Sequence, residues 1–237
     1  MRLELTPMPG PPPKVTHVRD AFLAEIATAR SLVAAVRALP QKVHPNAPAG
    51  IHPKHVRQIT GLAFIGVVAA WEEFLERALV RYLAGAATNS GYTALPKYGR
   101  AADLGHAYEL LSQDSNYDPQ KNYLKVSDAR WVWRTADFFF SQHHFGLLTP
   151  KVDLLSNANR IRNRIAHDSD KCKADFKAAA VWFLQPANGN LTKGFSPGEL
   201  LLTTATRNFG SALNGAGISH FEAYMRVFEG LASGVVP

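Results

Sequence analysis

A short stretch of the sequence, from Arg160 to His167, carries the side chains best suited to chemistry. Within it, Arg162, Asn163 and His167 form an Arg-Asn-x-x-x-His pattern. An imidazole exchanges a proton near neutral pH, and a guanidinium holds a phosphate through a planar fork of donors. Together these groups suit the cleavage of an RNA phosphodiester, a reaction that would need neither a metal ion nor another cofactor.

The pattern lies in a segment, Pro150 to His167, that predicts a helix with its proline in the first turn. Apolar residues at helical spacing predict a buried stripe of Leu154, Ala158, Ile161 and Ile165. The opposite, polar stripe comprises Arg160, Asn163, Arg164 and His167. Arg162 lies at the edge between the stripes, and the negative end of the helix dipole favours positive charge on His167. The same pattern also fits an ordinary solvated basic face that ends in a histidine.

Two long helices are predicted before this segment. Val15 to Leu39 and Lys54 to Ala84 both show apolar residues at helical spacing. Pro40 should end the first helix, and the prolines that follow, up to Pro53, should keep the link out of a helix. Glu73 precedes Arg77 by four residues, which is the favourable order for an ion pair on a helix. These two helices should supply most of the core.

Shorter elements are expected around the motif helix. Ala86 to Arg100 resembles a loop, Ala102 to Leu111 a short helix, and the aromatic segment Arg130 to Phe145 a further helix. Arg130 to Arg134 interleaves basic and aromatic residues, which suits either the stacking of single-stranded bases or, our preferred interpretation, the core.

The C-terminal third should contain two further helices. Asp168 to Asp170 resembles a break with a new N-cap, after which a helix should run to Leu184. That helix should bury Phe176, Ala179, Ala180 and Phe183. Glu199 to Thr204 suggests a short strand or turn. Ser219 to Ala232 suggests a last helix with Ser219 as N-cap and Glu222 at the capping-box position.

Composition limits the class of protein. The chain has 237 residues, 46% of them hydrophobic, and a net charge of +7, which favours an anionic partner such as nucleic acid. The single cysteine, Cys172, excludes an intrachain disulfide. The apolar stretch from Gly61 to Trp71 is too short to span a bilayer, and the start does not resemble a signal peptide. We expect a cytoplasmic protein without a membrane partner, and no metal site at His52 and His55.

The motif, together with two others, resembles the HEPN superfamily of α-helical ribonucleases and nucleotide-binding proteins. Arg162 to His167 looks like its Arg-Asn-x-x-x-His signature. Trp71-Glu72-Glu73-Phe74-Leu75 resembles the Trp-Glu-x-Phe element of the prokaryotic RiboL-PSP type, and the segment from Ser196 to Leu200 resembles the C-terminal end of that subgroup. The resemblance covers most of the chain, but the Pro-rich start, the Pro40 to Pro53 link and the aromatic segment have no counterpart in it.

The resemblance implies an all-α fold, a HEPN-like up-and-down bundle of about four to five helices with extra short helices and loops. Residues 15–235 would form this single domain, and residues 1–14 a flexible Pro-rich N-terminus. It also implies a homodimer in which two copies of the motif face each other. Many such proteins are metal-independent endoribonucleases in toxin–antitoxin or phage-defence systems, so an antitoxin protein is a possible partner. Others are inactive modules that bind nucleotides, RNA or proteins.

Each motif residue then has an expected role. Two copies of His167 would act as base and acid on the RNA, and Arg162 would stabilise the charge that gathers on the phosphate. Asn163 would orient the phosphate or the imidazole. Arg160 and Arg164 would attract the RNA backbone. Glu72 would orient Arg162 or His167, or would simply be a surface or interhelix salt-bridge carboxylate.

Overall fold

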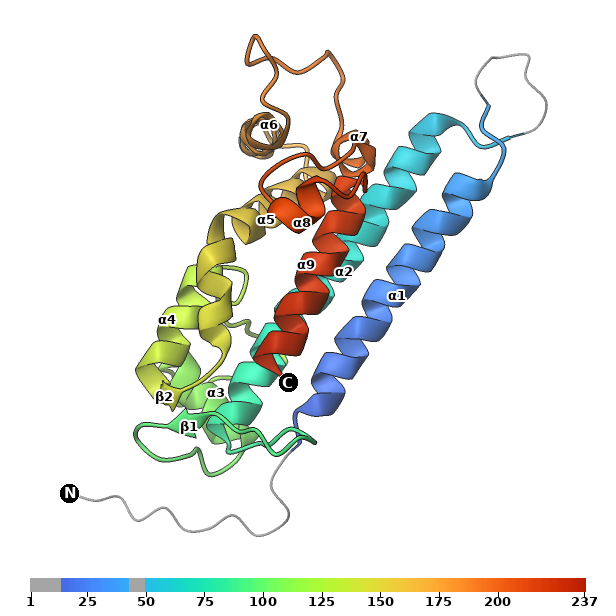
Figure 1. Ribbon diagram of the computed structural model, residues 1–237. Helices are drawn as coiled ribbons and strands as arrows, with labels where there is room; N and C mark the ends of the chain where they lie inside the picture. The colour runs from blue at the N-terminus through green and yellow to red at the C-terminus, as the bar shows by residue number, and fades with distance from the viewer. Residues whose placement is uncertain (1–13, 43–49) are drawn as a thin grey trace. The chain divides into compact units, whose positions relative to one another are not determined.

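The computed structural model describes residues 14–42 and 50–237 and is dominated by helices (Figure 1). In chain order the elements are α1 (Thr16–Ala38), α2 (Pro53–Leu83), β1 (Leu95–Pro96), α3 (Leu104–Ser112), α4 (Ala129–Phe139), β2 (Phe140–Gln142), the 3-10 helix η1 (Phe145–Lys151), α5 (Val152–Ala166), α6 (Asp170–Leu184), α7 (Pro197–Leu202), α8 (Ser211–Asn214) and α9 (His220–Val235). The expected all-α class is confirmed.

Both predicted long helices are present with nearly the expected ends. Pro53 is the first residue of α2 rather than part of the link, because a proline at the first helical position gives up no hydrogen bond. The ion pair between Arg77 and Glu73 is formed at 2.8 Å. The expected flexible segment 1–14, apart from Lys14, and the prolines between residues 43 and 49 lie outside the described residues.

The chain divides into two compact units. The first contains the described residues 14–23, 71–152 and 230–237, and the second contains residues 24–42, 50–70 and 153–229. The single domain expected for residues 15–235 remains a prediction.

In the first unit, aromatic rings join α1 to α2. Phe22 lies 5.5 Å from Trp71 and 5.4 Å from Phe74, measured between ring centroids. The buried Tyr82 donates its hydroxyl proton to the carbonyl of Val235 at 3.1 Å and so ties α2 to the C-terminal end of α9. These contacts give the first unit a core of its own.

The aromatic segment of the first unit differs from the prediction. The helix expected over Arg130 to Phe145 ends at Phe139, and β2 then pairs antiparallel with β1 inside the expected loop Ala86 to Arg100 (Figure 1). Only part of the segment is core, because Phe140 and Phe145 are buried whereas Phe138 is 58% exposed. Pro150 lies in η1, two residues before α5 begins, and not in the first turn of α5 as predicted.

In the second unit the core surrounds Tyr224 on α9. The rings of Phe64, Phe183 and Phe209 lie within 5.9 Å of the Tyr224 ring, and its hydroxyl donates to the carbonyl of Leu154 at 3.1 Å. Helix α6 buries Phe176, Ala179, Ala180 and Phe183, as predicted. Aromatic packing of this kind contributes more than the buried area alone.

An ion-pair network also joins α1 to α9 in this unit. The Arg30 guanidinium donates to both carboxylate oxygens of Glu222, at 2.8 and 3.0 Å, and to Glu229. Burial alone would lower the pKa of Arg30, but the bonds to Glu229 and Glu222 raise it overall. Arg30 therefore stays charged. Ser219 caps α9 as predicted by accepting from the Glu222 N–H at 3.3 Å.

The short strand or turn expected over Glu199 to Thr204 is wrong for its first four residues, because helix α7 extends to Leu202, whereas Thr204 forms an isolated antiparallel bridge with Ser219. Ser196 caps this helix by accepting from the Glu199 N–H at 3.2 Å, and Pro197 is its first residue. Gly198 touches α2 so closely that a Cβ there would lie 2.0 Å from the Arg57 carbonyl oxygen. Arg57 also pairs with Glu199 at 3.3 Å. The Ser-Pro-Gly-Glu segment therefore packs α7 directly against α2.

Helix α2 is long and apolar enough to cross a membrane, judged by length and composition alone. Half of its most apolar window is buried inside the structure, and core helices of soluble proteins meet the same criterion. The expectation of a protein without a membrane partner therefore remains a prediction.

Candidate functional site

The motif residues occupy the last turn of α5, in the second unit. Helix α5 ends at Ala166, and the His167 N–H still donates to the Asn163 carbonyl at 2.8 Å. This bond carries the helical path one residue further. The side chains of Asn163 and His167 consequently follow one another along the same face of the helix, as the four-residue spacing predicts.

The apolar face of α5 fixes the direction of this polar face. Leu154, Ala158 and Ile161 are buried as predicted. Ile165 is half-buried and contacts α2, because a Cβ at Gly61 would lie 3.5 Å from its side chain. The motif therefore lies on a helix that is held by core packing on its opposite side.

The motif side chains differ in exposure. His167 is exposed, and Asn163 is half-buried. Arg162 is also half-buried, in agreement with the predicted position at the edge between the stripes. An exposed imidazole at a helix end is accessible to a ligand or to a second protein chain.

Arg160 and Arg164, the other two arginines near the motif, contact residues within α5 or directly after its end. The Arg164 guanidinium donates to the His167 carbonyl at 3.2 Å and pairs with Asp168 at 2.9 Å. Arg160 is exposed and donates to the side-chain oxygen of the buried Asn157 at 3.1 Å. Arg164 therefore caps the end of α5. This structural role was not predicted from the sequence, which suggested only attraction of the RNA backbone.

A charged link connects the end of α5 to the start of α6. Asp168, which pairs with Arg164, also lies 3.5 Å from Lys173. Ser169 caps α6 by accepting from the Cys172 N–H at 3.3 Å, so the predicted break and new N-cap are confirmed. The short turn after His167 is thus fixed by both helices.

Glu72, the predicted accessory carboxylate, lies on α2 in the first unit and is half-buried. The motif, in contrast, lies in the second unit. The suggested role of Glu72 in orienting Arg162 or His167 therefore remains a prediction.

The described part of the chain contains histidine, cysteine and carboxylate side chains that could in principle bind a metal ion. No group of three or more histidine, cysteine, aspartate or glutamate side chains there is arranged to hold a metal ion. His52 and His55 lie with their ring centroids 6.2 Å apart.

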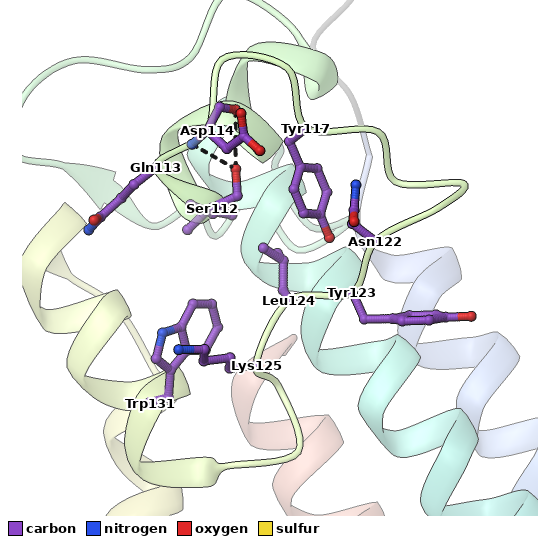
Figure 2. A pocket seen from close by; sticks show the side chains of 10 residues that line it. Ser112, Gln113, Asp114, Tyr117, Asn122, Tyr123, Leu124, Lys125 and Trp131 are labelled. Atoms are coloured by element: carbon purple, nitrogen blue, oxygen red, sulfur yellow. Dashed lines mark hydrogen bonds between the residues drawn. The ribbon is translucent and has the colours of Figure 1, made fainter.

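A pocket in the first unit was not anticipated from the sequence. It has a volume of about 500 Å³ and lies between the connection of α3 to α4 and the start of α4 (Figure 2). Its lining includes Tyr117, Asn122, Leu124, Lys125 and Trp131. One signal was available, because residues 113–128 form a connection of unusual length without regular structure, and such loops are commonly functional.

Comparisons with protein-family models, with curated proteins and with solved structures find no match to this chain.

Proposed function

We propose that the protein is a metal-independent endoribonuclease of the HEPN type, with His167, Arg162 and Asn163 as its active-site residues. The observation that carries this proposal is the exposed His167, which continues α5 through its bond to the Asn163 carbonyl at 2.8 Å. That arrangement presents an imidazole and an amide on one face, with a guanidinium at its edge. The net charge of +7 agrees with an RNA substrate.

The chemistry requires two proton transfers. A base removes the proton of a ribose 2′-hydroxyl, whose oxygen attacks the adjacent phosphorus, and an acid protonates the departing 5′-oxygen. The products are a 2′,3′-cyclic phosphate and a 5′-hydroxyl. Arg162 would stabilise the charge on the phosphate oxygens in the transition state, and Asn163 would orient the phosphate or the imidazole.

One motif supplies one histidine, so the proposal includes a symmetric homodimer in which His167 acts in both copies. The exposure of His167 is compatible with such an arrangement. Sedimentation should show a dimer at micromolar concentration, and a monomer that retains full activity would contradict this part of the proposal. A cytoplasmic location and a toxin–antitoxin or defence system with an antitoxin partner belong to the same proposal.

The deciding experiment compares His167→Ala with His55→Ala, which changes an exposed histidine on α2 in the same unit. The assay uses labelled single-stranded RNA in the presence of EDTA and detects 2′,3′-cyclic phosphate ends. We expect His167→Ala to abolish cleavage and His55→Ala to leave it unchanged. Cleavage that survives His167→Ala would overturn the site. A wild-type dimer that cleaves no RNA would instead favour an inactive module that binds RNA, nucleotides or a protein.

A further inference from the structure

The pocket beside Trp131 has walls that are fixed before any ligand binds. In the connection from α3 to α4, the Asp114 carboxylate accepts from the Asn116 N–H and the Asp118 carboxylate from the Gln120 N–H, both at 2.9 Å. Asp128 then caps α4 by accepting from the Arg130 N–H at 2.9 Å. Such side-chain-to-backbone bonds hold turns in a defined shape. The pocket is therefore preorganised although a loop forms most of it.

Trp131 gives this pocket a flat aromatic wall. It rises from α4 toward Leu124, which is buried and forms the floor (Figure 2). Trp131 itself is only half-buried, so part of its indole remains available to a ligand. Tyr123 points away from the pocket in Figure 2 and is 88% exposed. An indole face beside an apolar floor suits the flat ring of a nucleobase.

The opposite wall supplies hydrogen-bonding groups. The Tyr117 hydroxyl is buried and has no hydrogen-bond partner among the described residues. Burial raises the pKa of Tyr117, so the hydroxyl keeps its proton and can donate. Asn122 already donates its amide N–H to the Asp118 carbonyl at 3.3 Å, which leaves its oxygen to accept. A donor and an acceptor side by side match the polar edge of a base.

A second tyrosine holds Tyr117 in place. The rings of Tyr108 and Tyr117 stack with centroids 5.6 Å apart and planes at 12°. Tyr108 in turn donates its hydroxyl proton to the Glu76 carboxylate at 3.0 Å. The position of the Tyr117 ring therefore depends on α2 and α3 as well as on the loop.

Charge is distributed unevenly along the pocket. Lys125 is exposed and lines the same pocket as Trp131 (Figure 2). Asp114, the acidic residue of the lining, lies at the opposite end, where its carboxylate is already engaged by the Asn116 N–H. An ammonium and an aromatic side chain that line one pocket suit a base with its phosphate.

We propose that this pocket binds one nucleobase with its phosphate, stacked on Trp131, as part of a single-stranded RNA or as a free nucleotide. Tyr117 and Asn122 contact the edge of the base, and Lys125 contacts the phosphate. The site lies in the first unit and is independent of the cleavage proposed for α5. Binding and cleavage are therefore separable in experiment.

The test measures equilibrium binding by fluorescence anisotropy, with the full chain carrying His167→Ala so that the RNA remains intact. The probe is a short fluorescein-labelled single-stranded RNA. We expect Trp131→Ala to weaken binding about tenfold, as for the loss of one base–aromatic stack, and Trp131→Phe to retain most of the affinity. Tyr98→Ala, which removes an aromatic side chain that is 67% exposed and lies outside the pocket, should have no effect.

Two further binding experiments identify the chemical group that the pocket recognises. A strand of the same length with abasic ribose at every position should bind as weakly to the parent protein as the intact RNA binds to Trp131→Ala. Competition by AMP would identify a free nucleotide as a ligand, and failure of AMP to compete with bound RNA would assign the site to the strand. Equal binding of abasic and intact strands would overturn the proposal.

Folding of each variant is checked by far-ultraviolet circular dichroism. If Trp131→Ala does not fold, Trp131→Leu becomes the deciding variant, because it keeps an apolar side chain and removes only the aromatic face. Affinity of Trp131→Leu within about twofold of the parent would refute base stacking at this pocket. The outcome does not depend on whether the wild-type protein cleaves RNA.

Discussion

The motif on α5 and the pocket beside Trp131 are held in place by different kinds of interaction. Regular helical bonds and buried side chains such as Leu154 and Ile161 position the motif. Carboxylate-to-backbone bonds from Asp114, Asp118 and Asp128 position the pocket. The motif should therefore tolerate most polar substitutions around it but not faulty packing beneath it, whereas the pocket should be sensitive to the loss of single carboxylates.

After the loss of His167, which should abolish cleavage, the largest effect should come from Arg162, within the motif. Loss of a donor that faces the transition state commonly costs about 2.7–4 kcal/mol, so Arg162→Ala should lower the rate of RNA cleavage by about a hundredfold to a thousandfold. Arg162→Lys should restore only part of the rate, because an ammonium lacks the planar fork. Single-turnover kinetics on labelled RNA would measure both variants.

Arg164 provides the matched control for Arg162. Its guanidinium already contacts the His167 carbonyl and Asp168. Arg164→Ala should therefore change the rate much less than Arg162→Ala does. Equal losses from the two arginines would mean that the motif is only part of a general basic surface.

Packing elsewhere in the second unit, which carries the motif, is tested at Gly198, where α7 meets α2. A Cβ at this position would lie 2.0 Å from the Arg57 carbonyl oxygen, so Gly198→Ala should push α7 away from α2 and destabilise the protein by about 3 kcal/mol. Gly66 is the control, because it lies within α2 with open space around its Cβ position. Gly66→Ala should stabilise the protein by about 0.5–1 kcal/mol through helix propensity.

Urea denaturation would measure both glycine variants. Similar stability of the two would show that the contact between α7 and α2 carries little energy.

A smaller effect should follow from the loss of helix caps. Asp128→Ala removes the N-cap of α4 beside the pocket, and Ser169→Ala removes the N-cap of α6 beside the motif. Each should lower the free energy of unfolding by about 1 kcal/mol. Only Asp128→Ala should also weaken RNA binding to the pocket, as measured by the anisotropy assay. Equal weakening by both caps would show that binding follows overall stability rather than the shape of the loop.

The sequence was sufficient to predict the elements that periodicity controls. The stripes of α1, α2, α5 and α6 were predicted because each helix has one continuous apolar face and clear ends, such as Pro40 and Ser169. Helix α7 was missed because it has six residues, too few to show a period. Its sequence signals were the cap Ser196 and the proline after it, which the prediction did not use.

The aromatic segment and the pocket show where periodicity is insufficient. The strand β2 directly follows α4 because Leu95 and Pro96 offer it a pairing partner from far away in the chain. A pairing of that kind leaves no local pattern in the sequence. The loop that lines the pocket is built from aspartates whose backbone bonds depend on individual turns rather than on spacing. The unusual length of the loop was one signal of the pocket, and the basic and aromatic residues of Arg130 to Arg134, which include Trp131, were another.

The smallest predicted effect concerns His220, a buried residue of the second unit. Its ring lies 5.0 Å from Phe183, and its Nδ1 lies 2.9 Å from the Thr203 carbonyl oxygen. Burial lowers the pKa of His220, more than its backbone hydrogen bonds raise it. In the unfolded chain this pKa returns to its ordinary value near 6.5, so below about that pH the unfolded state binds a proton that the folded state excludes. The contribution of His220 to stability should therefore be complete at about pH 7.5 and should decrease as the pH falls.

Urea denaturation at about pH 7.5 and pH 5.5 would measure this effect. The free energy of unfolding should decrease less between the two pH values in His220→Asn than in wild type, whereas His55→Asn, at an exposed position, should match wild type. An identical decrease in wild type and His220→Asn would show that protonation of this ring does not oppose folding, and that the aromatic core around Tyr224 accommodates the charge.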